Sequence, residues 1–361
     1  MPVVPNGRRS IPRTWIRPGI AILLLCIGLV AVAGCGSSSS SASSSTSESD
    51  TTSGAETTSG GESTTGGATV VNCGVHVHVD QPPTRAISLN QGATELMLTL
   101  GLQNSMIGTA YLDDSVLPSL QSAYESVPVL SKEYPSAESF LAEEPDFAIA
   151  SYESAFGTKE GVGTRSSLEK LGIATYLMPD GCANANENVP WTFADNFNEI
   201  RQVGTLFGVE EKAQEVIARQ QAELKEAVGS GPAPGKGHTV MWWDSDDKSP
   251  FVGTCCGGPG LIMKTVGATN VFAGVKGNWQ NVNWEAAIAK DPEVIVLIDA
   301  GWDTAKSKIK FIEGDPALQS LPAVKEKHFV IIPFSDSTPG VRNVDGVKKL
   351  AAGLRKIYPS G

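Results

Sequence analysis

Histidine, cysteine and long apolar stretches are all scarce in this chain of 361 residues. It contains four histidines and six cysteines, and charged residues make up only 19% of it. The formal net charge of −11 argues against a nucleic-acid partner, because a phosphate backbone requires a basic surface. After residue 35 no apolar run is long enough to cross a bilayer. These shortages argue against nucleic-acid proteins, channels and disulfide-dense mini-domains, and the length leaves room for about two domains and a tail.

Common catalytic and metal-binding motifs are also missing. The sequence has no Gly-x-Ser-x-Gly, no His-Glu-x-x-His, and no Ser-x-x-Lys followed by Lys-Thr-Gly. Its cysteines and histidines do not have the spacing of a zinc site. Asp and Glu number 39, so a hydrolase that uses a carboxylate pair stays open as an alternative. The sequence favours a binding function that needs no catalytic residue, metal or cofactor.

The N-terminus has the pattern of an export signal. Four arginines precede an uncharged apolar segment, residues 18–34, which ends in Val-Ala-Gly directly before Cys35. This ending resembles the bacterial lipobox, in which the cysteine is lipidated and becomes the mature N-terminus. A plain signal peptide or a single anchor helix are the alternatives. We expect a lipoprotein signal peptide over residues 1–34 and lipidation at Cys35.

The segment after Cys35 cannot form a core. Residues 36–67 contain only Gly, Ser, Thr, Ala, Glu and Asp, so they bury no large apolar side chain. As a coil, such a segment spans roughly 30 Å. We expect residues 35–67 to be a flexible tether that holds a globular head at the outer face of the cell membrane, in a periplasm or a Gram-positive envelope.

Four cysteines remain in the exported part of the chain. Outside the cytoplasm such thiols tend to pair. We expect a disulfide between Cys73 and Cys182, which lie at the two edges of the first half. The adjacent Cys255 and Cys256 are either bridged to each other or free, and the sequence does not decide between these states.

Short apolar runs alternate with helical patterns along the head, which predicts an α/β fold with parallel sheets. The expected strands are 85–89, 106–110, 147–151, 174–177, 238–243, 294–298 and 329–332. Two expected helices, 93–100 and 260–266, are each followed by a glycine that suits a helix end.

The two halves of the head repeat one another. Residues 138–146 match residues 285–293, and an apolar strand follows each. Between the halves, Thr192 and Asp195 have the spacing of a capping box, and a helical pattern interrupted near Gly208 follows. We expect an N-terminal lobe over 68–190, a linking helix over 191–230 and a C-terminal lobe over 231–361.

Four motifs occur in the order of a known family. They are Arg85-Ala-Ile-Ser-Leu-Asn-Gln-Gly-Ala-Thr-Glu95, Leu100-Gly101, Glu138 with Glu144-Pro145-Asp146, and Trp279-Gln-Asn-Val-Asn-Trp-Glu285. Together they resemble the class III, helical-backbone substrate-binding proteins of ABC importers, which bind ferric siderophores, haem or cobalamin. The resemblance covers about residues 85–359. It implies two Rossmann-like lobes joined by a long interdomain helix, with the ligand cleft between them.

The resemblance also implies a partner. In this family the two lobes sit on a permease dimer, and glutamates at the starts of equivalent helices dock on its arginines. The matching residues here are Glu138 and Glu285. Two exposed carboxylates of this kind suit a symmetric basic receptor, although acids in a first helical turn are also common for stability alone. We expect a monomeric head that binds the permease and does not act as an enzyme.

The ligand cleft is expected at the loops that follow the strands, because ligands of open parallel sheets bind at that edge. Candidate ligand-binding residues are Asn90, Gln91, Tyr111, Lys132, Tyr134, Trp242, Trp243, Trp279, Ser335 and Asp336. Trp279 matches a family position that contacts ligand, and flat aromatic rings suit large chelates.

Acidic residues outnumber cations around these loops. Only Lys132, Lys248 and Arg342 are available as cations, which argues against a strongly anionic ligand and favours a cationic or neutral chelate, cobalamin or haem. An envelope-bound hydrolase and a surface module that binds a chelate without transporting it are the alternatives to an importer component.

Overall fold

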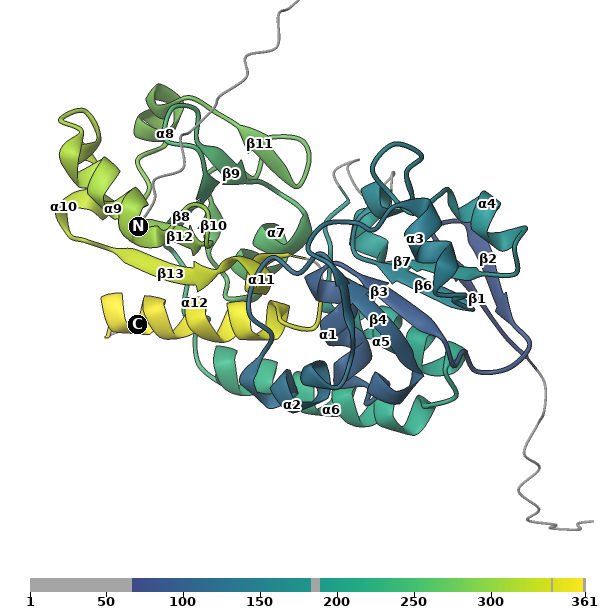
Figure 1. Ribbon diagram of the computed structural model, residues 1–361. Helices are drawn as coiled ribbons and strands as arrows, with labels where there is room; N and C mark the ends of the chain where they lie inside the picture. The colour runs from purple at the N-terminus through teal and green to yellow at the C-terminus, as the bar shows by residue number, and fades with distance from the viewer. Residues whose placement is uncertain (1–66, 183–188, 339, 360–361) are drawn as a thin grey trace, which may run out of the picture. The chain divides into compact units, whose positions relative to one another are not determined.

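The structure, a computed structural model, describes residues 67–182, 189–338 and 340–359 (Figure 1). All of these belong to one compact unit, Glu62–Gly361. The expected signal peptide, Cys35 and all of the expected tether except Gly67 lie outside the described residues. Among the helices that are described, none combines the length and the apolar character needed to span a membrane.

The N-terminal lobe is built on a five-stranded parallel sheet with the order β5-β4-β3-β6-β7. Its strands are β3 (Ala86–Leu89), β4 (Met106–Ala110), β5 (Val129–Ser131), β6 (Phe147–Ala150) and β7 (Ala174–Leu177). The central strands β3 and β6 are buried at every residue, as expected for a parallel sheet covered on both faces. A separate hairpin, β1 (Ala68–Asn72) and β2 (Val75–Val79), precedes the sheet.

Short helices connect these strands. They are α1 (Gln91–Thr99), α2 (Gln121–Glu125), α3 (Ala137–Ala142) and α4 (Arg165–Glu169), with 3-10 turns η1 (Gln103–Ser105), η2 (Pro118–Leu120), η3 (Glu153–Phe156) and η4 (Pro179–Gly181). Helix α1 is buried along nearly its whole length, because it packs on the sheet in the main core of this lobe.

The C-terminal lobe has a mixed sheet with the order β11-β9-β8-β12-β13, and β10 pairs with β8. Its strands are β8 (Thr239–Ser245), β9 (Phe251–Gly253), β10 (Thr269–Asn270), β11 (Trp279–Asn281), β12 (Val294–Asp299) and β13 (Phe329–Pro333). Its helices are α7 (Gly257–Thr265), α8 (Trp284–Lys290), α9 (Ala305–Gly314), α10 (Pro322–Lys325), α11 (Phe334–Ser337) and α12 (Asn343–Ile357), with the 3-10 turn η6 (Leu318–Ser320). Strands β8, β10, β12 and β13 are parallel, whereas β9 and β11 are antiparallel to their neighbours.

Two helices connect the lobes, α5 (Phe193–Leu206) and α6 (Glu210–Val228). The interruption expected near Gly208 is confirmed, and so is the capping box of Thr192 and Asp195. Helix α6 contributes Val216 and Ile217 to the core of the first lobe and Ala227 to that of the second. It therefore acts as the long linking helix that the resemblance implies.

The internal repeat has a structural counterpart. In the first lobe, the Asp146 carboxylate accepts hydrogen bonds from the backbone N–H groups of Thr84 and Arg85, at 2.8 and 3.0 Å, just before β3. In the second lobe, the Glu293 carboxylate accepts one from the N–H of Thr239 at 2.8 Å, at the start of β8. The last acid of each repeated motif thus caps the central strand of its own sheet, which confirms the expected two-lobed α/β fold.

Two cysteine pairs are joined in the structure. The Cα atoms of Cys73 and Cys182 lie 5.6 Å apart, and this bond ties the β1–β2 hairpin to the segment after β7. The Cα atoms of Cys255 and Cys256 lie 3.7 Å apart, in a bond between adjacent residues directly before α7.

Candidate functional site

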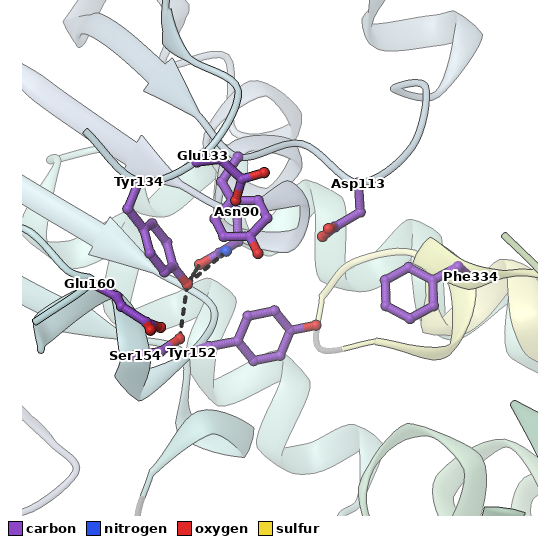
Figure 2. A pocket seen from close by; sticks show the side chains of 9 residues that line it. Asn90, Asp113, Glu133, Tyr134, Tyr152, Ser154, Glu160 and Phe334 are labelled. Carbon is purple, nitrogen blue, oxygen red and sulfur yellow. Dashed lines mark hydrogen bonds between the residues drawn. The ribbon is translucent and has the colours of Figure 1, made fainter. Parts of the chain in front are cut away.

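A cavity of about 460 Å³ lies where the strands of the N-terminal sheet end (Figure 2). Its lining residues are Asn90, Tyr111, Asp113, Glu133, Tyr134, Tyr152, Ser154, Glu160 and Phe334. Eight of the nine come from the N-terminal lobe, and only Phe334 comes from the C-terminal lobe. The cavity has the position, size and mix of aromatic and polar groups of a small-molecule site.

Parallel strands explain why these residues meet. Asn90 directly follows β3, Tyr111 directly follows β4, and Tyr134 and Tyr152 come shortly after β5 and β6. Because all four strands run in the same direction, their carboxyl ends lie along one edge of the sheet. Phe334 directly follows β13 and occupies the corresponding edge of the second sheet.

Two of the lining residues have an unusual backbone. Asn90 has a φ of 76° and Tyr111 has a φ of 60°, a region that residues other than glycine rarely adopt. Backbone hydrogen bonds hold both in place: the Asn90 N–H donates to the carbonyl of Ala110 at 3.0 Å, and the Tyr111 N–H donates to that of Ser131 at 3.3 Å. Such conformations cost about 1–3 kcal/mol each and gather at functional sites, so they support a binding role for this edge.

Hydrogen bonds fix the Tyr134 ring. The Asn90 side-chain amide donates to the Tyr134 hydroxyl at 2.9 Å, and that hydroxyl also lies 3.0 Å from the Ser154 hydroxyl. The Tyr111 ring meets the Tyr134 ring edge to face, with centroids 4.6 Å apart. A ligand in the cavity would therefore meet aromatic surfaces that are already positioned.

The charged groups of the cavity are all acidic. Burial, followed by the charges of Glu133 and Asp114, raises the pKa of Asp113 to about 6. Burial also raises the pKa values of the Tyr111, Tyr134 and Tyr152 phenols, which stay protonated and can donate hydrogen bonds at neutral pH. Among the described residues that line the cavity there is no Lys, Arg or His.

The structure places three of the predicted ligand residues in the cavity, namely Asn90, Tyr111 and Tyr134. Two others neighbour it in sequence but are buried among internal partners. The Gln91 amide donates to Glu95 at 2.8 Å, and the Ser335 hydroxyl donates to Asp114 at 3.2 Å. Lys132 is exposed and does not line the cavity.

The other predicted ligand residues are located elsewhere. Trp242 and Trp243 are completely buried on opposite faces of β8, in two separate cores, so they are core residues and not cleft residues. Asp336 is also fully buried, because it pairs with Arg342 and Lys349 at 2.6 Å each. Trp279 is half-buried on β11 and does not line the cavity.

Five lining residues were missed in the sequence. They are Asp113, Tyr152, Ser154, Glu160 and Phe334, whereas Glu133, which also lines the cavity, lies between Lys132 and Tyr134 in a loop that the sequence indicated. Tyr152 and Ser154 follow β6, and Phe334 follows β13. The rule that ligands bind at the carboxyl ends of parallel strands would therefore have found them, had more residues of each loop been included. Glu160 lies ten residues after β6, and no local pattern marked it.

The two predicted docking glutamates occupy equivalent positions. Glu138 and Glu285 are the second residues of α3 and α8, and both are exposed. Each helix has a capped start, since Ser136 accepts from the Ser139 N–H at 3.1 Å and Asn283 accepts from the Ala286 N–H at 2.7 Å. Helix α3 follows β5, a strand of the parallel first sheet. Helix α8 follows β11, which runs in the same direction as β8 because β9 is antiparallel to both. Both helices therefore begin at the carboxyl edges of their sheets.

Comparison with known proteins gives a consistent result. The sequence matches the family described as periplasmic binding protein over residues 87–335. It is 22% identical, over 78% of this chain and 82% of the relative, to the uncharacterized ABC transporter substrate-binding lipoprotein YvrC of Bacillus subtilis strain 168.

Solved structures are similar over most of the chain. A periplasmic binding protein from Veillonella parvula is 32% identical, with a TM-score of 0.71, and covers 80% of this chain and 98% of its own. An ABC-type Fe3+-hydroxamate transport system from Saccharomonospora viridis is 24% identical, with a TM-score of 0.66, over 81% and 99%. The periplasmic heme-binding protein RhuT from Roseiflexus sp. RS-1 is 18% identical, with a TM-score of 0.59, over 76% and 99%. The last two similarities show the fold alone.

Proposed function

Because the chain belongs to the periplasmic binding protein family, we propose that it is the substrate-binding component of an ABC importer. In this proposal it captures an iron-siderophore, haem or cobalamin-type chelate outside the cytoplasm and delivers it to an ABC permease. The observation that carries the proposal is the cavity of about 460 Å³ with its positioned tyrosines. The relatives that support it are substrate-binding proteins and not enzymes.

We further propose that the lobes move little when the ligand binds. Several side chains connect them directly. The Arg342 guanidinium lies 3.4 Å from the Glu95 carboxylate, Ser335 donates to Asp114, and the Asn278 amide donates to Asp180 at 3.4 Å. Helix α6, which packs in both cores, opposes hinge motion.

The position of the protein on the cell is also a proposal. A lipid on Cys35 would anchor the chain, and the Gly/Ser/Thr-rich tether would let the head reach the permease. The B. subtilis relative is named as a lipoprotein, which supports this arrangement. In an oxidising compartment we expect the Cys73–Cys182 bond to form.

We propose that Glu138 and Glu285 bind the permease. Replacing both by Gln removes two exposed charges without disturbing a core, so ligand affinity should not change. Uptake in cells at limiting ligand should fall about tenfold, because two solvated ion pairs of ~0.5–1 kcal/mol each would be lost.

The matched control is Glu143→Gln with Glu326→Gln, which removes the same charge from exposed sites outside the first helical turns. Uptake by the control should equal that of the unmodified protein. Equal uptake by all three proteins would refute the docking assignment, and reduced ligand affinity in the first double variant would show that these residues act elsewhere.

A further inference from the structure

Among the described residues that line the cavity, three carry carboxylates and none is a cation. Asp113, Glu133 and Glu160 line it, and Asp114 adds a fourth charge close to Asp113. Arg342 interacts with the charge of Asp114, but it already contacts Asp336 at 2.6 Å and Glu95 at 3.4 Å. An anionic ligand entering this space would be repelled, and a cationic one would be attracted.

A second cation of the C-terminal lobe, Lys308, also contacts internal groups of the protein. Lys308 is fully buried, and its Nζ atom donates to the carbonyls of Ile298 and Asp303 at 2.8 and 2.7 Å. It also lies 3.2 Å from the Asp303 carboxylate. These contacts hold the turn from Ala300 to Asp303, which is closed by backbone hydrogen bonds in both directions.

This turn presents an exposed tryptophan. Trp302 is 60% exposed, and its ring meets the Phe334 ring edge to face with centroids 4.9 Å apart. Because Phe334 lines the cavity, Trp302 extends the aromatic surface outward on the side of the C-terminal lobe. An exposed ring next to the cavity offers apolar surface to the part of a ligand that extends out of it.

We propose that the ligand is a chelate with net positive charge, bound with its cationic group at Asp113, Glu133 and Glu160 and with its apolar part against the tyrosines, Phe334 and Trp302. This inference rests on the proposed function and names the charge class of its substrate. The phenols donate hydrogen bonds to the oxygens of the chelate, and the carboxylates select its charge.

The test compares two chelates that share the same iron-binding groups and differ in charge at one terminal amine. One is a linear ferric trihydroxamate with a free terminal ammonium, and the other is the same chelate with that amine acetylated. Titration of the purified full-length protein, followed by tryptophan fluorescence, should give at least about tenfold tighter binding of the charged form, since one partly buried ion pair is worth ~1.4 kcal/mol or more.

Variants of the protein show which residues cause the preference for the positively charged chelate. In Asp113→Asn with Glu133→Gln, the ratio of the two affinities should fall below about threefold, whereas Glu210→Gln, an exposed control on α6, should keep the full ratio. Trp302→Ala should weaken the binding of both chelates about fivefold and keep the ratio of their affinities, because it removes apolar contact that both chelates share.

Three results would overturn the inference. If the acetylated chelate binds equally well or better, the charge assignment is wrong and the proposed function survives. If an anionic ferric tris-catecholate or haem binds more tightly than the cation, the same conclusion follows. If no chelate of any charge binds, the proposed function fails together with the inference.

Discussion

Replacing Arg342 by Met is expected to lower the free energy of unfolding by about 3–5 kcal/mol, because buried Glu95 loses its cationic partner and buried Asp336 keeps only Lys349. Asp336 and Glu95 are almost completely inaccessible, and Arg342 bridges them between the two lobes. Burial already raises the pKa of Glu95, and the charge of Arg342 opposes that rise. Denaturant unfolding at pH 7 measures the loss.

Two controls separate this interaction from ordinary surface ion pairs. Lys212→Met breaks an exposed pair with Glu215 and should change stability by less than about 0.5 kcal/mol. Adding Glu95→Gln to Arg342→Met should recover part of the loss, because one unpaired charge is then removed. A loss below about 1 kcal/mol for Arg342→Met would contradict the role assigned to the bridge.

Replacing Glu199 by Gln is expected to stabilise the protein at pH 8 by about 2–4 kcal/mol, since each unit of pKa shift corresponds to about 1.4 kcal/mol. Burial, followed by the charge of Asp180, raises the pKa of Glu199 to about 8, and burial raises that of Asp180 to about 7. Between the ordinary carboxyl pKa and these values, the folded protein binds more protons than the unfolded chain. This contribution to stability is therefore present at low pH and is lost as the pH rises towards 8.

The free energy of unfolding of each variant is compared with that of the unmodified protein over a range of pH. Glu199→Gln should gain most at pH 8 and less than about 1 kcal/mol at pH 5, where Glu199 is protonated in the folded protein. Glu210→Gln, an exposed acid at the start of α6, should give a curve parallel to that of the unmodified protein. Parallel curves for both variants would show that Glu199 carries its charge without penalty in the fold.

The fold could be predicted well because local patterns and tertiary packing agree in it. Each of the seven expected strands occurs within a few residues of its predicted bounds, since central parallel strands are short, apolar and flanked by helices. The glycines after α1 and α7, Gly101 and Gly267, both have a φ of 75°, as a helix end requires. The antiparallel strands β9 and β11 were not foreseen, because strands of three residues each carry too little sequence pattern.

The site could be predicted only in part. The ends of strands located Asn90, Tyr111 and Tyr134, because sheet topology alone brings such residues together. The prediction for Trp242 and Trp243 failed for a physical reason. Alternation of side chains along a strand puts these two rings on opposite faces of the sheet, but it does not show that both faces of the sheet are covered by other elements. Asp336 was misjudged because its partners lie later in the chain, Arg342 directly before α12 and Lys349 within it, and only packing shows that they neutralise it.

Equilibrium titration of the full-length protein with ferric siderophores, haem and cobalamin tests the central claim most directly. The account predicts saturable binding of at least one of these chelates at one molecule per chain, with no chemical change in the chelate. Tyr134→Ala should weaken that binding at least about tenfold, because it removes a positioned aromatic surface and the hydroxyl shared with Asn90 and Ser154. Turnover of the chelate, or binding that Tyr134→Ala leaves unchanged, would contradict it.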